Sequence, residues 1–265
     1  MKLVSSRDNP LYKSLVALAG SARERREKGR TLLEGIHLVT EYRDARGLPE
    51  LVLVSESGRG HGEIRALLES LDGAQVVMFP DRMFERVAQV SAPVGIAAVI
   101  PIIVPGPGPD PALGVLLEDI QDPGNVGTIL RCAAAAGAQA AWLSRGCADP
   151  WSPRVLRAAM GAHFRLPVHA GANLITVARE FRGRVVAALP RAGRSLYECR
   201  LTGPLALVLG SEGSGVSAAL LAEADETVFI PMAPGAESLN AAAAAAVCLF
   251  EAVRQRSVES RESRV

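Results

Sequence analysis

The sequence predicts an α/β protein in two parts, a small N-terminal α/β RNA-binding domain and a larger C-terminal domain built on a parallel sheet. Two observations support the division and the sheet. Residues 101–111 read PIIVPGPGPDP, and prolines at this spacing interrupt helices and central strands and favour an extended linker. After this stretch, nearly continuous apolar runs alternate with helical stretches, which is typical of parallel strands buried on both faces. We therefore expect domains at 1–100 and 113–265, joined by a linker over 101–112.

The first part alternates between strand-like and helical segments, which fits a small sandwich domain. It opens with a basic, helix-compatible run over residues 23–30, and a further helical stretch ends near residue 46. Strand-like segments are expected at 51–54, 74–79 and 95–100, with a helix around 62–71. The five basic residues and two glutamates of 23–30 usually mark a solvated helix face, and the functional alternative is contact with an RNA backbone.

The second part has a more regular pattern. Strands are expected at 114–117, 140–144, 184–188, 205–209 and 227–231, helices near 125–136, 153–160, 173–182 and 216–223, and a long alanine-rich helix over 239–256. In open α/β sheets, ligands bind beyond the carboxyl ends of the strands. The loops that follow these strands are therefore the places where a site is expected.

Composition limits the function classes. The 265 residues carry 29 basic and 28 acidic side chains, a formal net charge of +1, which argues against a polycationic protein that coats nucleic acid but leaves room for a local basic face. All but three of the basic residues are arginine; arginine suits bidentate phosphate contacts, and a GC-rich genome would give the same bias. The four cysteines are scattered and favour neither a zinc site nor a disulfide framework. With no visible secretory signal and no apolar run long enough to span a bilayer, we expect a soluble, cytoplasmic protein.

The first chemistry-bearing segment follows the first of these strands and reads EDIQDPGNVGTILR over residues 118–131. Asp122 followed by Pro123 is a helix start, with a capping carboxylate before a proline at the first helical position. Helical spacing puts Arg131 on one face with two glycines and a threonine, which leaves open space for a phosphate or a ribose. The alternative is an arginine paired to a carboxylate at a packed helix interface.

The second segment is LVLGSEGSG at residues 207–215, whose glycines let the backbone approach a ligand closely. It lacks the Lys-Ser/Thr of a P-loop and the G-x-G-x-x-G spacing of a dinucleotide site, which counts against a nucleotide-binding oxidoreductase. Glu212 would repel a triphosphate, whereas it suits hydroxyls, amino groups or a cationic sulfonium. A sharp turn would explain the glycines equally well.

The third segment, FIPMAPGAESLN over 229–240, leads into the alanine-rich helix. Ser238 and Asn240 both suit a helix cap, and that structural role alone could account for them. Six alanines at 241–246 permit very close backbone packing.

The three segments, in this order and spacing, resemble motifs 1, 2 and 3 of the SpoU (TrmH-like) RNA ribose 2′-O-methyltransferases of the SPOUT class. The resemblance covers essentially all of 113–256, including SPRV at 152–155 and MGAHFRLP at 160–167. Residues 4–10 and the Leu-Glu-Gly at 33–35 are similar to the substrate-binding domain of the family's ribosomal RNA members.

The resemblance implies a C-terminal domain with a deep trefoil knot, S-adenosyl-L-methionine as cofactor, and a homodimer with its site at the subunit interface. Backbone groups around five residues would hold the adenine and ribose of the cofactor: Leu209, Gly210, Ile230, Met232 and Leu239. The reaction would be methyl transfer to a ribose 2′-OH in ribosomal RNA of the 23S type or, alternatively, in transfer RNA. A catalytically silent RNA-binding or assembly factor on this scaffold is the alternative from another class.

The resemblance also suggests roles for individual residues. A ribose 2′-OH is a poor nucleophile and needs a general base or an electrostatic equivalent. This role falls to Arg131, and because arginine ordinarily stays protonated, positioning and charge stabilisation is the physically safer description. We expect Asn125 and Glu212 to orient Arg131 and the ribose, and Ser238 and Asn240 to shape the substrate side of the pocket. No metal is needed, because a sulfonium is already an activated methyl donor.

For contact with RNA we expect the basic run of the first domain and the arginines of 145–165, where four arginines face a single acid. The residues are Arg23, Arg25 and Arg26, together with Arg145, Arg154, Arg157 and Arg165. A few local arginines on a nearly neutral chain predict an RNA affinity that weakens with salt, with a slope that reflects a few phosphate contacts.

Overall fold

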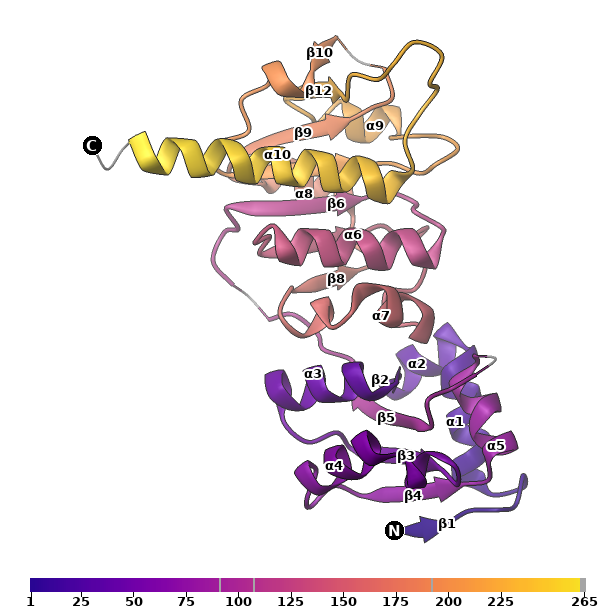
Figure 1. Cartoon of the computed structure of the whole chain (residues 1–265). Helices are drawn as coiled ribbons and strands as arrows, with labels where there is room; N and C mark the ends of the chain where they lie inside the picture. Colours follow the sequence, from indigo (N-terminus) through magenta and orange to yellow (C-terminus); the bar gives the residue numbers. More distant parts are fainter. Residues whose placement is uncertain (91, 107, 192, 263–265) are drawn as a thin grey trace. The chain divides into compact units, whose positions relative to one another are not determined.

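The computed structural model describes residues 1–90, 92–106, 108–191 and 193–262. The chain forms two compact units (Figure 1): unit 1 holds Met1–Ile103 and Trp151–Phe164, and unit 2 holds Val104–Pro150 and Arg165–Val265. Both units are α/β, as the sequence predicts. Within the described ranges, no helix combines the length and the apolar character needed to cross a bilayer.

Unit 1 is built on a mixed five-stranded sheet in the order β1-β4-β3-β5-β2. Strand β5 runs antiparallel to β2 and β3, while β4 is parallel to β1 and β3. The strands are β1 (Lys2–Leu3), β2 (Arg30–Glu34), β3 (Leu51–Ser55), β4 (Val76–Phe79) and β5 (Ile96–Pro101), and the helices are α1 (Pro10–Gly20), α2 (Ala22–Lys28), α3 (Ile36–Arg46), α4 (Gly62–Ser70) and α5 (Asp81–Ala88). The sequence patterns predict β3, β4 and β5 but miss β1, β2, α1 and α5.

Alternating side chains of this sheet fill two hydrophobic cores. Along β3, Leu53 belongs to one core, whereas Val52 and Val54 belong to the other. The first core contains residues of α1 and α5, and the second contains residues of α3 and α4. Because side chains of a strand point to opposite faces in turn, the helices cover both faces and form the sandwich that the sequence predicts.

Unit 1 is completed by a segment from the middle of the chain, Trp151–Phe164, which contains helix α7 (Pro153–Ala159). This helix packs against β2, an edge strand of the sheet. The Thr31 hydroxyl in β2 donates a hydrogen bond to the Trp151 carbonyl at 2.5 Å. The sequence pattern assigns this segment to the 113–265 domain, because a helical pattern does not show which sheet the helix covers.

Unit 2 carries a seven-stranded sheet in the order β10-β12-β9-β11-β6-β7-β8, and every described strand pairing in it is parallel. The predicted parallel sheet is therefore confirmed. Its strands are β6 (Leu113–Leu117), β7 (Ala140–Leu143), β8 (Val168–Ala170), β9 (Arg184–Ala188), β10 (Arg194–Ser195), β11 (Leu205–Leu209) and β12 (Glu226–Phe229), and its helices are α6 (Pro123–Ala135), α8 (Leu174–Glu180), α9 (Ala218–Leu221) and α10 (Ala241–Glu262). Short 3₁₀ turns lie at Gly58–Gly60 and Ala162–Phe164 in unit 1 and at Leu196–Glu198 in unit 2.

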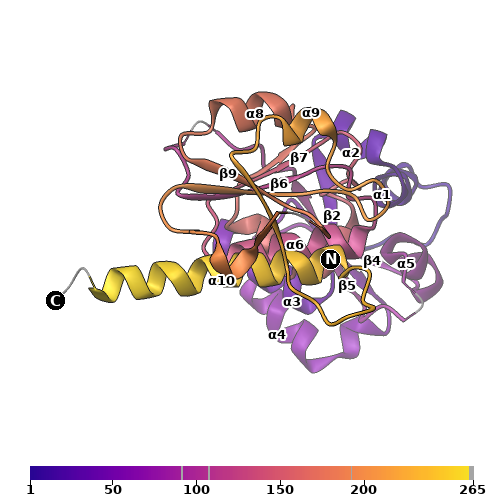
Figure 2. The ribbon, with the colours of Figure 1, turned by 90° about the horizontal axis from the view of Figure 1, so that it is seen from above.

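The helices of unit 2 cover both faces of its sheet (Figure 2). Helices α8 and α9 contact one another on one face, and α6 packs along α10 on the other. Buried positions of α10 include Ala242, Ala245 and Ala252. Their small side chains let α10 pack closely against its neighbours, as the alanine-rich sequence predicts.

The strand order brings the carboxyl ends of β12, β9, β11 and β6 side by side. Parallel strands end at the same edge of a sheet, so the loops that follow these four strands meet there. The three segments singled out in the sequence, 118–131, 207–215 and 229–240, all begin or end at this edge.

Candidate active site

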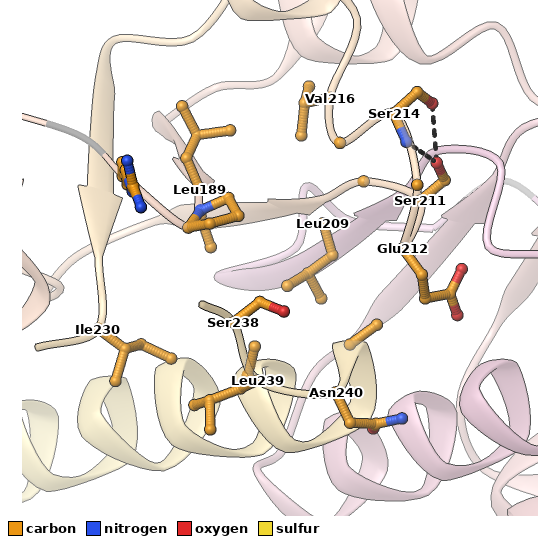
Figure 3. Close-up of a pocket in the computed structure, with 18 of the residues that line it drawn as sticks. Leu189, Leu209, Ser211, Glu212, Ser214, Val216, Ile230, Ser238, Leu239 and Asn240 are labelled. Atoms are coloured by element: carbon orange, nitrogen blue, oxygen red, sulfur yellow. Dashed lines mark hydrogen bonds between the residues drawn. The ribbon is translucent and has the colours of Figure 1, made fainter. Parts of the chain in front are cut away.

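A cavity of about 620 Å³ lies at this edge of the sheet in unit 2. It is lined by the loops after β9, β11 and β12 and by the first turn of α10 (Figure 3). All five residues predicted to hold the cofactor line it: Leu209, Gly210, Ile230, Met232 and Leu239. Of the predicted catalytic residues, Glu212, Ser238 and Asn240 also line it, while Asn125 and Arg131 lie on α6.

The loop after β11 is closed by its own backbone. Ser211 and Gly215 exchange two backbone hydrogen bonds, at 3.1 and 3.0 Å, and the Ser214 N–H donates to the Ser211 hydroxyl at 3.0 Å (Figure 3). A Cβ on Gly210 would lie 2.2 Å from the Gly215 carbonyl carbon and 2.4 Å from the Val216 nitrogen. Gly215 adopts a φ of +68°, a conformation that favours glycine. Loop closure therefore requires these two glycines, and the closed loop forms one wall of the cavity.

The far end of this loop is anchored to the segment that follows β6. Ser217 donates from its backbone N–H and from its hydroxyl to the two carboxylate oxygens of Glu118, each at 2.7 Å. The Glu118 N–H in turn donates to the Leu209 carbonyl at 2.9 Å. Motifs 1 and 2 of the sequence are thus held together at the edge of the sheet.

Apolar side chains form much of the cavity wall (Figure 3). Leu209, Ile230 and Leu239 converge on it from three different segments. Leu239 remains 42% exposed, so apolar surface lies open at the cavity. Glu212 lies on the side away from Leu189, so the cavity has an acidic group apart from the apolar side chains of its wall, and Arg191 also lines it. Such a division is typical of small-molecule sites, where a few polar groups orient an apolar ligand.

A chain of hydrogen bonds links the three motifs. Asn240 donates from Nδ2 to Oδ1 of Asn125 at 2.9 Å, and Asn125 donates from its own Nδ2 to Oε1 of Glu212 at 2.5 Å. The backbone N–H of Asn125 donates to Oδ1 of Asp122 at 2.8 Å, and this is the helix cap that the Asp-Pro pair predicts. The structure therefore shows hydrogen bonds between Asn240, Asn125 and Glu212 that the sequence patterns do not predict.

Residues 112–250 match the SpoU rRNA Methylase family, and residues 9–98 match the MRM3-like substrate binding domain. The chain belongs to the SpoU rRNA methylase family. The resemblance drawn from the three motifs is therefore confirmed.

Two relatives and one solved structure illustrate this membership. A 23S rRNA (guanosine(2553)-2′-O)-methyltransferase of Bacillus subtilis is 36% identical over 258 residues, a match that covers 94% of this chain and 98% of the relative. A 23S rRNA (uridine(2479)-2′-O)-methyltransferase of Streptomyces viridochromogenes is 31% identical over 264 residues, covering 94% and 91%. The crystal structure of the SpoU methyltransferase AviRb from Streptomyces viridochromogenes, in complex with AdoMet, matches with a TM-score of 0.82 at 29% identity and covers 94% of this chain and all of that one.

In this SpoU family member, Arg131 occupies the exposed side of α6. Within the described ranges its guanidinium forms no hydrogen bond or ion pair, so neither the expected contact with Asn125 and Glu212 nor the alternative pairing with a carboxylate is seen. Asn125 and Glu212 bond to one another instead. The Ser238 hydroxyl likewise has no hydrogen-bond partner in the described part of the chain, so both groups are open to a ligand.

The structure corrects the expectation that Arg25 contacts RNA. Arg25 is only 4% exposed, and one of its guanidinium nitrogens donates to the carbonyls of Leu18 and Ala19, each at 2.9 Å. Carbonyl groups at a helix end have no partner inside the helix. Arg25 therefore closes the end of α1 and leaves little surface for a phosphate.

The other predicted RNA-binding arginines reach the surface to differing degrees. Arg23 pairs with Glu27 at 2.7 Å, and Arg157 pairs with the largely buried Glu34 at 3.1 Å. The exposed arginines of this set are Arg23, Arg26 and Arg154 in unit 1 and Arg145 and Arg165 in unit 2. Of the three in unit 1, Arg26 and Arg154 have guanidinium groups that make no hydrogen bond or ion pair with any described residue.

The cysteines are poorly suited to nucleophilic chemistry. Burial raises the pKa of all four thiols, to about 12 at Cys248. A raised pKa disfavours the thiolate, which is the nucleophilic form. At Cys132, next to Arg131, the positive charge opposes this rise without cancelling it. The described residues also include no group of three or more His, Cys, Asp or Glu that could hold a metal ion.

Sequence reasoning missed the loop that follows β9. Leu189, Pro190 and Arg191 line the cavity but belong to no motif. The sequence pattern predicts the strand Arg184–Ala188 with the bounds that are observed, so its carboxyl end is the available signal. Only the strand order, with β9 beside β11, shows that this end borders the same cavity.

Proposed function

We propose that this protein is an S-adenosylmethionine-dependent methyltransferase that modifies a ribose 2′-OH in ribosomal RNA of the 23S type. The observation that carries the proposal is the cavity at the carboxyl ends of β9, β11 and β12, with Glu212 and Asn240 in its lining and Asn125 hydrogen-bonded to both. Membership of the SpoU family and relatives named for 23S rRNA 2′-O-methylation support the reaction and its substrate.

The cavity fits S-adenosylmethionine in size and chemistry. Small-molecule pockets span about 300–1,000 Å³, and this one measures about 620 Å³. Leu209, Ile230 and Leu239 offer apolar surface to the adenine ring, while the backbone of the loop after Gly210 offers polar groups to the ribose. The Glu212 carboxylate suits a positively charged ligand. When bound, the cofactor supplies a methyl group that its sulfonium charge has already activated.

Arg131 acts on the RNA side of the reaction. Its guanidinium stays protonated, so it donates hydrogen bonds and does not accept a proton. The N–H groups of this guanidinium make no hydrogen bond to any described residue, so they are available to an RNA phosphate and to the 2′-oxygen. The 2′-oxygen attacks the methyl carbon as the methyl–sulfur bond breaks, and its proton passes to water. Negative charge develops on the oxygen in this step, and a donor fixed at that point stabilises the transition state.

The exposed arginines bind RNA phosphates. Arg26 and Arg154 in unit 1 have donors that no described residue engages, and Arg145 and Arg165 expose their side chains on the surface of unit 2. Phosphate contacts of this kind position an RNA without reading its sequence. They therefore provide affinity and leave the choice of nucleotide to the cavity and its rim.

Helix α10 presents an apolar stripe that a second copy of the chain would cover. Phe250 is 47% and Val258 is 44% exposed, and Ala243 and Val247 are partly or fully exposed on the same helix. These positions recur at helical spacing and share one face, which also carries the exposed Arg254, paired with Glu251. A homodimer through this stripe agrees with the dimer that the family resemblance implies.

The substrate can be tested directly. Tritiated methyl groups transferred from S-adenosylmethionine to purified ribosomal RNA, with transfer RNA as a parallel substrate, separate the two RNA classes. Label in ribosomal RNA alone supports the proposal, and label in transfer RNA alone moves the same reaction to that substrate. Binding of S-adenosylmethionine without any transfer would favour the silent RNA-binding factor.

Bacterial relatives named for 23S rRNA support a cytoplasmic location.

A further inference from the structure

The side-chain amide of Asn240 has its direction fixed by helix α10. Its Oδ1 accepts hydrogen bonds from the N–H groups of Ala242 at 2.9 Å and Ala243 at 3.2 Å. The first N–H groups of a helix have no partner inside it, and an oxygen at the cap satisfies them. An amide carries one oxygen and one NH₂ group. Because the oxygen caps the helix, only the NH₂ group of Asn240 can face outward.

The orientation of the Asn240 amide fixes the orientation of the Asn125 amide. The NH₂ group of Asn240 donates to Oδ1 of Asn125 at 2.9 Å, so that oxygen is engaged as an acceptor. The NH₂ group of Asn125 must then point the other way, where it donates to Oε1 of Glu212 at 2.5 Å. An ionised carboxylate can only accept, and it ends the chain. Each link thus runs in one direction, from the helix to Asn240, then Asn125, then Glu212.

We propose that Asn240 is a positioning residue: the N-terminus of α10 sets the polarity of a hydrogen-bond relay that holds the Glu212 carboxylate as an acceptor at the cavity. Oε1 is engaged by Asn125, and Oε2 has no hydrogen-bond partner within the described residues. Glu212 lines the cavity, so Oε2 is offered to a hydrogen-bond donor of the bound ligand, such as a hydroxyl, an N–H or an ammonium group. The role of this relay in methyl transfer rests on the proposed function. The existence of the relay does not depend on that function.

Asn240→Asp tests the relay because it separates the cap from the donor. Aspartate caps a helix as well as asparagine, and its charge is favourable at a helix N-terminus, so α10 keeps its cap. The introduced aspartate cannot donate to Asn125, and if the Asn125 amide turned to donate to it, the Asn125 oxygen would face the Glu212 carboxylate. Asn173→Asp is the matched control, since Asn173 caps α8 in the same unit through its Oδ1.

The expected result is a coupling with position 212. Asn240→Asp lowers the folded-to-unfolded ratio by about two- to tenfold relative to Asn173→Asp, the size of one neutral hydrogen bond. With Glu212→Gln in the same chain this loss disappears, because the introduced glutamine amide can donate to Asn125 and the relay runs in reverse. The side-chain NH₂ signals of Asn125 in NMR spectra should shift in the single variant and shift again in the double variant.

Asn125→Ala distinguishes the relay from plain repulsion between two carboxylates. In that background the coupling should vanish; a coupling that persists would arise directly between positions 240 and 212 and would overturn the proposal. An Asn240→Asp protein as stable as its control, with unchanged Asn125 signals, would overturn it too. The double variant should regain stability in the unfolding measurement. In methyl-transfer assays it should not regain activity. These stability and NMR measurements do not depend on enzyme activity. The proposed function fails separately if the wild-type protein transfers no methyl group.

Discussion

The side-chain amide of Asn125 donates to the Glu212 carboxylate at 2.5 Å, although the two residues lie 87 positions apart in the sequence. Asn125 sits in the first turn of α6, after β6, and Glu212 sits in the loop after β11. Strands β6 and β11 are parallel neighbours in the sheet of unit 2, so both side chains emerge at the same edge. Strand pairing therefore brings Asn125 next to Glu212, which lines the cavity.

Arg131→Ala should lower methyl transfer at least about 10²-fold, the low end for removing a donor that stabilises developing negative charge. Affinity for S-adenosylmethionine should hardly change, because Arg131 does not belong to the cavity lining. Transfer of tritiated methyl groups and calorimetric titration measure the two quantities. Arg182→Ala, at an exposed arginine paired with Asp110, is the control and should change neither. Unimpaired transfer by the Arg131 variant would remove this residue from the mechanism.

Gly210→Ala should weaken binding of S-adenosylmethionine by about tenfold or more. The added methyl group would overlap the backbone of Gly215 and Val216, and interiors packed this closely accommodate extra atoms only by shifting the backbone. Gly213→Ala in the same loop is the control, because a Cβ there meets nothing within 4 Å. Calorimetric titration compares the two variants. Equal affinities would mean that the closed loop does not shape the cofactor site.

Arg25→Ala should destabilise unit 1 by about 1.5–3 kcal/mol, the range for hydrogen bonds to a charged group. It removes the donor that satisfies the carbonyls of Leu18 and Ala19. Arg26→Ala, at an exposed neighbour, should change stability by less than about 0.5 kcal/mol. Urea unfolding measures both. An Arg25 variant of normal stability with weakened RNA binding would restore Arg25 to the RNA-binding surface.

Arg26→Ala and Arg154→Ala should each weaken RNA binding and reduce the slope of log affinity against log salt by about one, as expected when one phosphate contact is lost. Arg179→Ala is the control, because Arg179 is paired with Glu223 at 2.5 Å. Binding titrations over a range of salt concentrations give the slopes. A wild-type affinity that does not depend on salt would contradict the proposed basic surface.

Phe250→Glu should shift a dimer toward monomer without loss of stability, because Phe250 is 47% exposed on a single copy of the chain. A charge in a covered apolar stripe is costly unless it is paired. Tyr197→Glu, at another exposed aromatic of unit 2, should leave assembly unchanged. Sedimentation equilibrium reports the oligomeric state. A monomeric wild-type protein, or a Phe250 variant that stays dimeric, would exclude this interface.

Much of unit 2 follows from local sequence patterns. The strands Arg184–Ala188 and Leu205–Leu209 are predicted with the bounds that are observed, because buried parallel strands form continuous apolar runs. The start of α6 follows from Asp122 and Pro123. The edge strands β8 and β10 are missed because they are short and carry His169 and Arg194, so their pattern does not stand out from a loop.

Long-range relationships could not be predicted in the same way. A basic run does not show that Arg25 turns inward to a helix end, and the helix of Pro153–Ala159 does not show that it covers the edge strand of unit 1. The relay through Asn125 depends on strand order, which no local pattern contains. The trefoil knot rests on the family resemblance alone, and the homodimer rests on that resemblance and on the exposed side chains of α10; both stay predictions.

The most direct test of the central claim is the chemical position of the transferred methyl group. Ribosomal RNA labelled by this protein from tritiated S-adenosylmethionine is hydrolysed in alkali, which cleaves an RNA chain only beside a free 2′-OH. Ribose 2′-O-methylation predicts that the label resides in alkali-resistant dinucleotides. Label in mononucleotides would mean that a base is methylated, and this result would contradict the assignment of ribose 2′-O-methylation.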